Sequence, residues 1–406
     1  MKRSVTLVAL TWLYAVTACA APPVPVDVAT ADNAFGLRLL NAVQDGAPGG
    51  NVVISPVGAA LDLSVVLNGV RGGTRDQMLA ALSLSGFELP AVDAANASLI
   101  KTLTAPAGSI TLSMAESLWF DGRRAKLRSD YVALTRAWCD ATVTDLDFSN
   151  PRAVANINDW ASQATHGRID RAIEHIGRDD FALLLNAVYF KGRWAHPFDK
   201  AQTRQGDFTL AGGAVKQIPR MTQSGRFDYF EMPALQAIRL IFGDGDFLME
   251  IFLPAPGSSL RELEASLTVP QWTDWKTRYA PRPGTLELPR FELRSQQRLE
   301  RPLQALGMTR LFQPQAAELT GMFDAAPGGS QSRGFFINAV VQSTYFKVDE
   351  EGAVAAAVTT VGVRATAMRR PPPPFHMIVD RPFLCAIEDH RSGALLFLGA
   401  IYDPEP

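Results

Sequence analysis

The sequence predicts an α+β fold in one large domain, and three observations support this prediction. Residues 336–348 alternate in character and are rich in β-branched and aromatic side chains, which is typical of a buried strand. Residues 56–70 form a long apolar helical segment that follows Ser55 at the N-cap and Pro56 in the first turn. No repeat or linker divides residues 32–403 of the 406-residue chain, so we expect a single domain.

The composition narrows the possible functions. Hydrophobic residues make up 47% of the chain and charged residues 20%, so a large core can form. The formal net charge is −2 and no block of like charges occurs. We therefore expect no nucleic-acid partner, because such partners require a basic surface.

The sequence lacks the common catalytic and metal-binding motifs. It contains no Gly-x-Ser-x-Gly elbow, no His-Glu-x-x-His, no phosphate-binding loop and no Cys-x-x-Cys pair. The five histidines are scattered, and none sits at metal-ligand spacing: His166, His175, His196, His376 and His390. We expect no enzyme activity, no metal and no cofactor. Cys139 and Cys385 imply no disulfide framework, and whether they meet stays open.

Residues 1–20 predict an export signal, with a basic pair followed by an apolar run too short to span a membrane. Two processing routes remain open. In the first, a lipobox of the bacterial type ends at Cys19, which is lipidated and anchors the protein to a membrane. In the second, cleavage follows Ala20. On either route, residues 21–31 are expected to form a tether. The protein is expected to be periplasmic, an outer-membrane lipoprotein or extracellular.

Periodicity predicts the first elements of the folded body. Apolar spacing indicates a helix over 32–44, and a short apolar strand follows at 51–54. The glycine pair 72–73 is expected to end the helix that begins at Pro56. The sequence of residues 74–77 then predicts a capping box at the start of the next helix.

Further strands and helices follow in order. Strands are predicted at 110–120 and 141–148, and an amphipathic helix begins near Asn150 and ends at Gly167. The final residues, 381–402, predict a closing hairpin with its turn at 389–393.

The segment that follows the strand at 336–348 is unusual. Two acids, Glu350 and Glu351, precede a run of small or β-branched residues: Gly352, Ala353, Val354, Ala355, Ala356, Ala357 and Val358. No charge or proline occurs in 352–363, and the polar, proline-rich tract 364–374 follows. An unpaired, charge-free segment of this kind in a long connection favours aggregation. Its presence therefore indicates a use.

The hinge sequence from Glu350 resembles that of the serpins, the serine protease inhibitors, and residues 183–199 resemble the family signature of a central strand with its exit turn. The resemblance covers about 32–403. It implies one domain over 32–406 with a large mixed central sheet, smaller sheets, about nine helices and an exposed reactive loop over about 350–374. It also implies strands at 221–229, 249–254 and 286–293 and a helix at 303–312.

The resemblance implies roles in opening the central sheet for five residues: Ser55, Asn186, Trp194, Arg290 and Gln342. Asn186 would hold the sheet by hydrogen bonding, and Trp194 would lie where the loop first inserts, although it is equally a core aromatic. Gln342 stands where serpins often carry histidine, and it can still donate and accept hydrogen bonds. Arg290 would face Glu350.

The resemblance implies inhibition of a serine protease by a monomeric suicide substrate. The protease cuts the loop and forms an acyl-enzyme, and the released strand inserts into the sheet and traps the enzyme. Two alternatives stay open: a binding protein with the same fold that does not inhibit, and an inhibitor of a cysteine protease. Ala353 and Val354 depart from the usual hinge residues but remain uncharged, as insertion requires.

The family's usual spacing from Glu350 places the cleaved bond between Thr366 and Ala367. Small neighbours favour an elastase-like or subtilisin-like protease, whose pocket rejects large side chains. A drift of one or two residues in this count brings in Arg364, Met368 and Arg369 as alternatives for the residue before the bond. Either arginine would recruit a trypsin-like enzyme.

Overall fold

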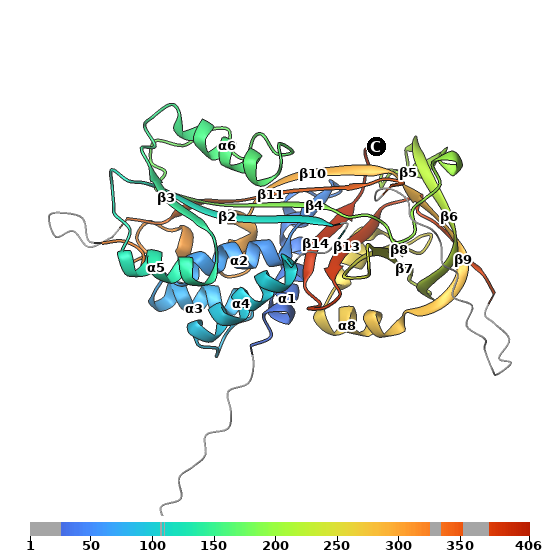
Figure 1. Cartoon of the computed structure of the whole chain (residues 1–406), viewed down its shortest axis with the longest axis horizontal. Coiled ribbons are helices and arrows are strands. Elements are labelled where there is room, and N and C mark those ends of the chain that lie inside the picture. The colour runs from blue at the N-terminus through green and yellow to red at the C-terminus, as the bar shows by residue number, and fades with distance from the viewer. Residues whose placement is uncertain (1–25, 106–107, 109, 325–333, 352–372) are drawn as a thin grey trace, which may run out of the picture.

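The computed structural model of the chain describes residues 26–105, 108, 110–324, 334–351 and 373–406. Two β-sheets lie side by side along the long axis of the molecule, with helices packed against them (Figure 1). None of the helices in these ranges is both long and apolar enough to cross a membrane.

The central sheet has five strands, in the order β10 (Phe291–Arg298), β11 (Ile337–Val348), β4 (Ala182–Lys191), β2 (Thr111–Asp121) and β3 (Thr142–Leu146). Helix α6 (Ala153–Ala164) covers one face and α2 (Pro56–Leu67) lies against the other (Figure 1). Because both faces are covered, β4 is buried at every position before Lys191, and its sequence is an almost continuous apolar run.

The second sheet has nine strands. Their order is β1 (Val52–Ile54), β14 (Leu395–Ile401), β13 (Phe383–Asp389), β8 (Phe247–Pro254), β7 (Leu235–Phe242), β6 (Val215–Met232), β9 (Ala280–Pro289) and β12 (Phe375–Ile378), while β5 (Arg204–Thr209) pairs with β6. The smaller sheets expected from the sequence are therefore one continuous sheet. The reason is β6, whose 18 residues pair with β5, β7 and β9 in turn.

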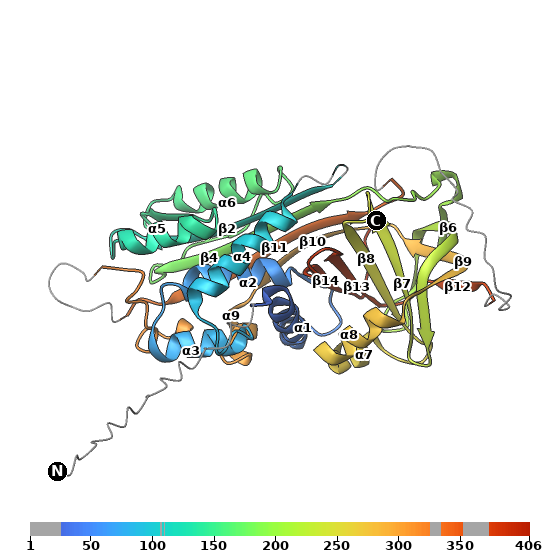
Figure 2. The same ribbon diagram turned by 60° about the horizontal axis from the view of Figure 1, so that its bottom comes forward.

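The described residues contain seven further α-helices: α1 (Val28–Gly46), α3 (Gly72–Ala81), α4 (Leu89–Leu103), α5 (Ser129–Trp138), α7 (Leu260–Ser266), α8 (Val269–Arg278) and α9 (Glu300–Ala305). Helices α1 to α4 gather beneath the central sheet, and α7 and α8 lie beside the nine-stranded sheet (Figure 2). Trp272 and Trp275 of α8 contact Phe252 of β8 and join this helix to the core.

The predicted mixed α+β fold is confirmed, but four local predictions were wrong. The glycine pair 72–73 does not end the helix that begins at Pro56, because α2 already ends at Leu67 and the pair begins α3. The capping box at 74–77 is absent, because α3 begins at Gly72 and the Glu318 carboxylate accepts from the Thr74 backbone N–H at 3.2 Å. The strand expected at 286–293 is two strands that part at Arg290 and enter different sheets. The helix expected at 303–312 breaks near Gly307, whose φ is +99°.

Candidate functional site

The candidate site is the seam, defined as the direct contact between β11 and β4 in the central sheet. These strands pair in parallel from Ile337 with Ala182 to Phe346 with Phe190. Their outer neighbours, β10 and β2, pair with them antiparallel. A strand that entered the seam could therefore run antiparallel to both β11 and β4.

The chain direction at the end of β11 fits such a strand. β11 ends at Val348, and the structure follows the chain only to Glu351 before the described residues resume at Pro373. A chain that reverses after Glu351 runs antiparallel to β11 and, because β11 and β4 are parallel, antiparallel to β4 as well. The seam therefore has the polarity needed to accept the residues that follow it.

An amide cluster, formed by Gln342, Asn186 and the backbone of Ser55, holds the middle of the seam. The Gln342 amide donates to Asn186 Oδ1 and to the Ser55 carbonyl, both at 2.9 Å. Gln342 Oε1 accepts from the Ser55 backbone N–H at 2.7 Å. All three residues are at most 2% exposed. Three chain segments, β11, β4 and the start of α2, are joined here by uncharged groups shielded from water.

Gly58 belongs to this cluster, and the sequence analysis missed it. The Gly58 backbone N–H donates to Ser55 Oγ at 3.1 Å, which forms the N-cap of α2. A Cβ atom at this position would lie 2.7 Å from Asn186 Oδ1 and 2.9 Å from Ser55 Oγ. A glycine is therefore needed for α2 to approach β4. A glycine two residues after the Ser-Pro pair is the signal that could have revealed this role.

The hinge end of the seam, defined by Trp194, Thr203, Arg290, Glu350 and Glu351, is held differently. The Trp194 indole N–H donates to the Asp349 carbonyl at 2.8 Å, and its ring stacks on Phe242 at 4.2 Å between centroids. Trp194 is thus both a core aromatic and a direct contact of the chain that leaves β11.

Glu350 is 5% exposed and has three neighbours at the hinge end. Thr203 Oγ1 donates to its Oε1 at 2.7 Å, whereas Arg290 Nη1 lies 3.8 Å from the same oxygen. The Phe198 backbone N–H donates to the Glu350 carbonyl at 3.0 Å. The threonine is the closer side-chain partner, and no sequence pattern around residues 200–204 pointed to it. Glu351 forms an ion pair with Lys200.

The described residues offer no evident covalent chemistry. Both thiols are buried and free, and burial raises the pKa of Cys139 to about 12 and the pKa of Cys385 still further. Neither thiol is therefore a ready nucleophile. Within the described ranges, no group of three or more histidine, cysteine, aspartate or glutamate residues could hold a metal ion.

Several predicted site residues lie outside the described residues. They are the lipidation candidate Cys19, the hinge residues Gly352 to Val358, the predicted bond at Thr366 and Ala367, and the alternatives Arg364, Met368 and Arg369. Their assignments stay predictions.

Comparisons with known proteins agree with this geometry. Residues 30–404 match the family model described as Serpin (serine protease inhibitor). The chain is 31% identical to the leukocyte elastase inhibitor of Sus scrofa, over 93% of this chain and 99% of that protein. It is 30% identical to Iripin-2 of Ixodes ricinus, over 91% and 92%.

Two solved structures also share the fold. Native tengpin, a thermophilic serpin, superposes with a TM-score of 0.82 at 24% identity, over 93% of this chain and 94% of that one. Native protease nexin-1 with heparin gives a TM-score of 0.82 at 25% identity, over 94% and 100%.

Proposed function

Because the chain belongs to the serpin family, we propose that it inhibits a serine protease as a suicide substrate. The protease attacks the chain between β11 and β12 and forms an acyl-enzyme. The freed segment that follows Glu351 then enters the seam and moves the attached protease with it. The catalytic geometry of the protease is distorted before deacylation can occur. The observation that carries this proposal is the direct parallel pairing of β11 with β4.

Insertion exchanges one set of strand contacts for two. β11 and β4 are already paired on their outer sides with β10 and β2. A new strand between them would pair with the inner edge of each, so neither strand would have an unpaired edge. One parallel ladder is lost and two antiparallel ladders are gained, and antiparallel pairing is slightly more stable per residue. The closed five-stranded sheet is thus the state from which a cleaved loop can gain contacts.

The lining of the seam explains why small uncharged residues suit the inserting segment. On the α6 side, β4 contributes Leu183 and Leu185 to one apolar cluster. On the α2 side, it contributes Leu184 and Val188 to the main core. Alternate residues of an inserted strand would enter both apolar layers. The alanines and valines of 353–358 fit both layers without burying a charge.

The proposed target is an elastase-like or subtilisin-like protease that cuts between Thr366 and Ala367. Support comes from the small residues around this bond and from the similarity to the leukocyte elastase inhibitor of Sus scrofa. If Arg364 or Arg369 preceded the cleaved bond, the target would instead be a trypsin-like protease.

Incubation with pancreatic elastase, subtilisin and trypsin tests both parts of the proposal. We expect a band at the summed mass that survives boiling in detergent, together with a released C-terminal peptide that begins at Ala367. Each protease inactivated beforehand at its serine is the control and should give no band. If all three active enzymes only cleave the chain and remain free, the proposed inhibition is wrong. A peptide that begins at Ala365 or Arg370 would instead assign an arginine to the bond.

We also propose that the protein is exported and that Cys19 is its lipid anchor, on the basis of the basic pair, apolar run and lipobox in residues 1–20. Expression in a bacterial host with labelled palmitate tests this assignment. Label should enter the full chain and should be lost in Cys19→Ala. An unlabelled mature chain that begins at Ala21 would indicate the competing cleavage.

A further inference from the structure

Two buried carboxyl groups beneath the central sheet lie close enough to interact electrostatically. Asp62 of α2 is 1% exposed and Glu116 of β2 is 8% exposed. Among the described residues, neither oxygen of Asp62 has a hydrogen-bond partner, and Glu116 Oε1 has none either. Buried carboxylates without donors are costly and therefore need an explanation.

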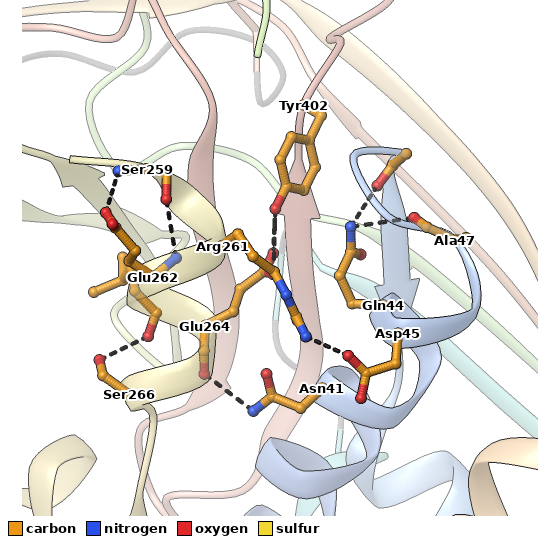
Figure 3. Close-up of polar contacts among 12 residues, drawn as sticks. Asn41, Gln44, Asp45, Ala47, Ser259, Arg261, Glu262, Glu264, Ser266 and Tyr402 are labelled. Atoms are coloured by element: carbon orange, nitrogen blue, oxygen red, sulfur yellow. Dashed lines mark hydrogen bonds and ion pairs between the residues drawn. The ribbon is translucent and has the colours of Figure 1, made fainter. Parts of the chain in front are cut away.

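Several other buried acids of this protein have a cation or a hydroxyl donor beside them, although Asp32 Oδ2 also lacks a hydrogen-bond partner among the described residues. Glu264 of α7 accepts from the Tyr402 hydroxyl at 3.2 Å and lies 3.4 Å from Arg261 (Figure 3). Glu250 forms an ion pair with Arg239 at 2.7 Å, and Glu388 forms one with Lys276 at 2.7 Å.

The groups around Asp62 and Glu116 supply no such cation. The titratable groups that interact with the pair are Tyr131 of α5 and Cys139 after that helix. Neither carries a positive charge, and the Tyr131 hydroxyl already donates to the Val65 carbonyl. The pair therefore sits in an apolar, acidic environment between α2 and β2.

The pair lies one helical turn from the amide cluster. Gly58 of α2 approaches Asn186, and Asp62 is four residues further along, on the same face of the helix. Glu116 is directly opposite Asn186 in the β2–β4 register. The contact between α2 and β2 and the amide cluster are thus neighbouring parts of one interface.

A proton gives the pair the donor that it lacks. With both groups ionised, two like charges interact in a region of low dielectric. With one proton, the protonated carboxyl can donate to its neighbour and join α2 to β2. Burial raises the pKa of Glu116 to about 7. Burial and the repulsion from Glu116 both raise the pKa of Asp62. The Ser117 backbone amide opposes this shift, although it lies outside hydrogen-bonding geometry.

We propose that the protonation state of the Asp62–Glu116 pair controls how readily the seam opens. This inference rests on the proposed loop insertion. To admit a strand, β4 must move away from β11 by about 4.8 Å. β2 pairs with β4 from Thr111 to Phe120 and moves with it, whereas α2 is held to β11 by the two hydrogen bonds between Ser55 and Gln342. Opening therefore draws Glu116 away from Asp62.

The direction of the pH effect follows. In the closed sheet the pKa of Glu116 is about 7, and in the opened, hydrated sheet it returns toward its ordinary value of 4.5. The closed state thus holds an extra proton between these two values. The resistance to opening is complete below about pH 4.5 and is lost as the pH rises through 7. For one group with these values, the opening equilibrium rises about tenfold between pH 6 and pH 8.

Uptake of a synthetic peptide tests the pair without any protease. A fluorescent peptide with the sequence of residues 353–363 is mixed with the full chain, and anisotropy follows its incorporation into the seam. We expect uptake about tenfold faster at pH 8 than at pH 6. Glu116→Gln should give nearly equal rates at the two pH values, and Asp62→Asn is a second variant with the same expectation. Glu264→Gln, which removes a buried acid away from the seam, is the matched control and should keep the wild-type ratio.

The outcomes separate this inference from the proposed function. Equal wild-type rates at pH 6 and pH 8, or an unchanged ratio in both Glu116→Gln and Asp62→Asn, would overturn the role of the pair. If the protein still traps a protease in that case, the proposed function stands. A chain that takes up no peptide at either pH contradicts opening of the seam itself. Should both variants fail to fold, equal wild-type rates at pH 6 and pH 8 would still overturn the role of the pair.

Discussion

The middle and the hinge end of the seam are held by different kinds of contact. The amide cluster in the middle uses uncharged groups that are at most 2% exposed, with distances of 2.7–2.9 Å. At the hinge end, the side chain of Arg290 is 41% exposed and those of Lys200 and Glu351 are more open still. Water can replace exposed charge pairs, but it cannot reach a buried cluster before strands separate. We infer that opening begins at the hinge end and that the middle sets the barrier.

The largest effect is expected where a charge must pass the hinge end and enter the middle. Ala355→Arg would carry a guanidinium into the apolar layers of the seam, at a cost of several kcal/mol. Insertion should slow relative to deacylation, so the fraction of trapped protease should fall roughly tenfold or more. Densitometry of complex and cleaved bands measures it. Ala355→Ser is the matched control, and unit stoichiometry in the arginine variant would show that this segment does not insert.

The next largest effect is expected in the middle of the seam. Gln342→Met keeps the length of the side chain but removes the acceptor of the Ser55 backbone N–H and the amide donor to Asn186 Oδ1. We expect a loss of about 2–4 kcal/mol in the free energy of unfolding. Urea unfolding of the variant measures this loss. Gln297→Met is the control, because Gln297 faces Gln342 across the β10–β11 pair without joining the cluster. Equal losses in the two variants would contradict a special role for the cluster.

A smaller effect is expected at Glu350. Glu350→Lys reverses a charge that Thr203 and Arg290 both face, and Arg290 is partly exposed, so each contact contributes only about 1 kcal/mol. The variant should form polymers at a lower temperature than the wild type. Arg290→Glu in the same chain should restore part of the resistance. Size-exclusion chromatography after mild heating gives the comparison, and a double variant that polymerises like Glu350→Lys would show that the two side chains do not cooperate.

The smallest effect is expected at the exposed rim of the hinge end. The Lys200 pair with Glu351 is open to solvent and screened by salt, so Lys200→Ala should leave the urea midpoint unchanged. Raising the salt from 0.1 M to 1 M shortens the Debye length from about 10 Å to about 3 Å. High salt should therefore lower the polymerisation temperature of the chain that has the Glu350–Arg290 contact. It should not lower the polymerisation temperature of a variant that lacks this contact. A large shift in Lys200→Ala would mean that this rim, rather than the middle, sets the barrier.

Local patterns in the sequence were enough for the elements that line the seam. The alternation at 336–348 predicted β11, and the Ser55-Pro56 pair predicted the start of α2. Resemblance to serpins added the approach of Arg290 to Glu350 and the roles of Ser55, Asn186 and Gln342 in opening the central sheet. These signals succeed because side-chain period and helix capping act over a few residues, within one element.

Tertiary structure decided what those patterns could not reach. Glu318 replaces a local cap at α3, Thr203 is closer to Glu350 than Arg290 is, and Arg290 itself separates two strands of different sheets. The interaction of Asp62 with Glu116 also depends on how α2 lies beneath β2. By itself, the sequence determined some of the strands and helices, among them β11 and the start of α2, and which segment is free of charge. Contacts between residues far apart in the chain were left to packing, because they depend on where elements meet and not on the order of their residues.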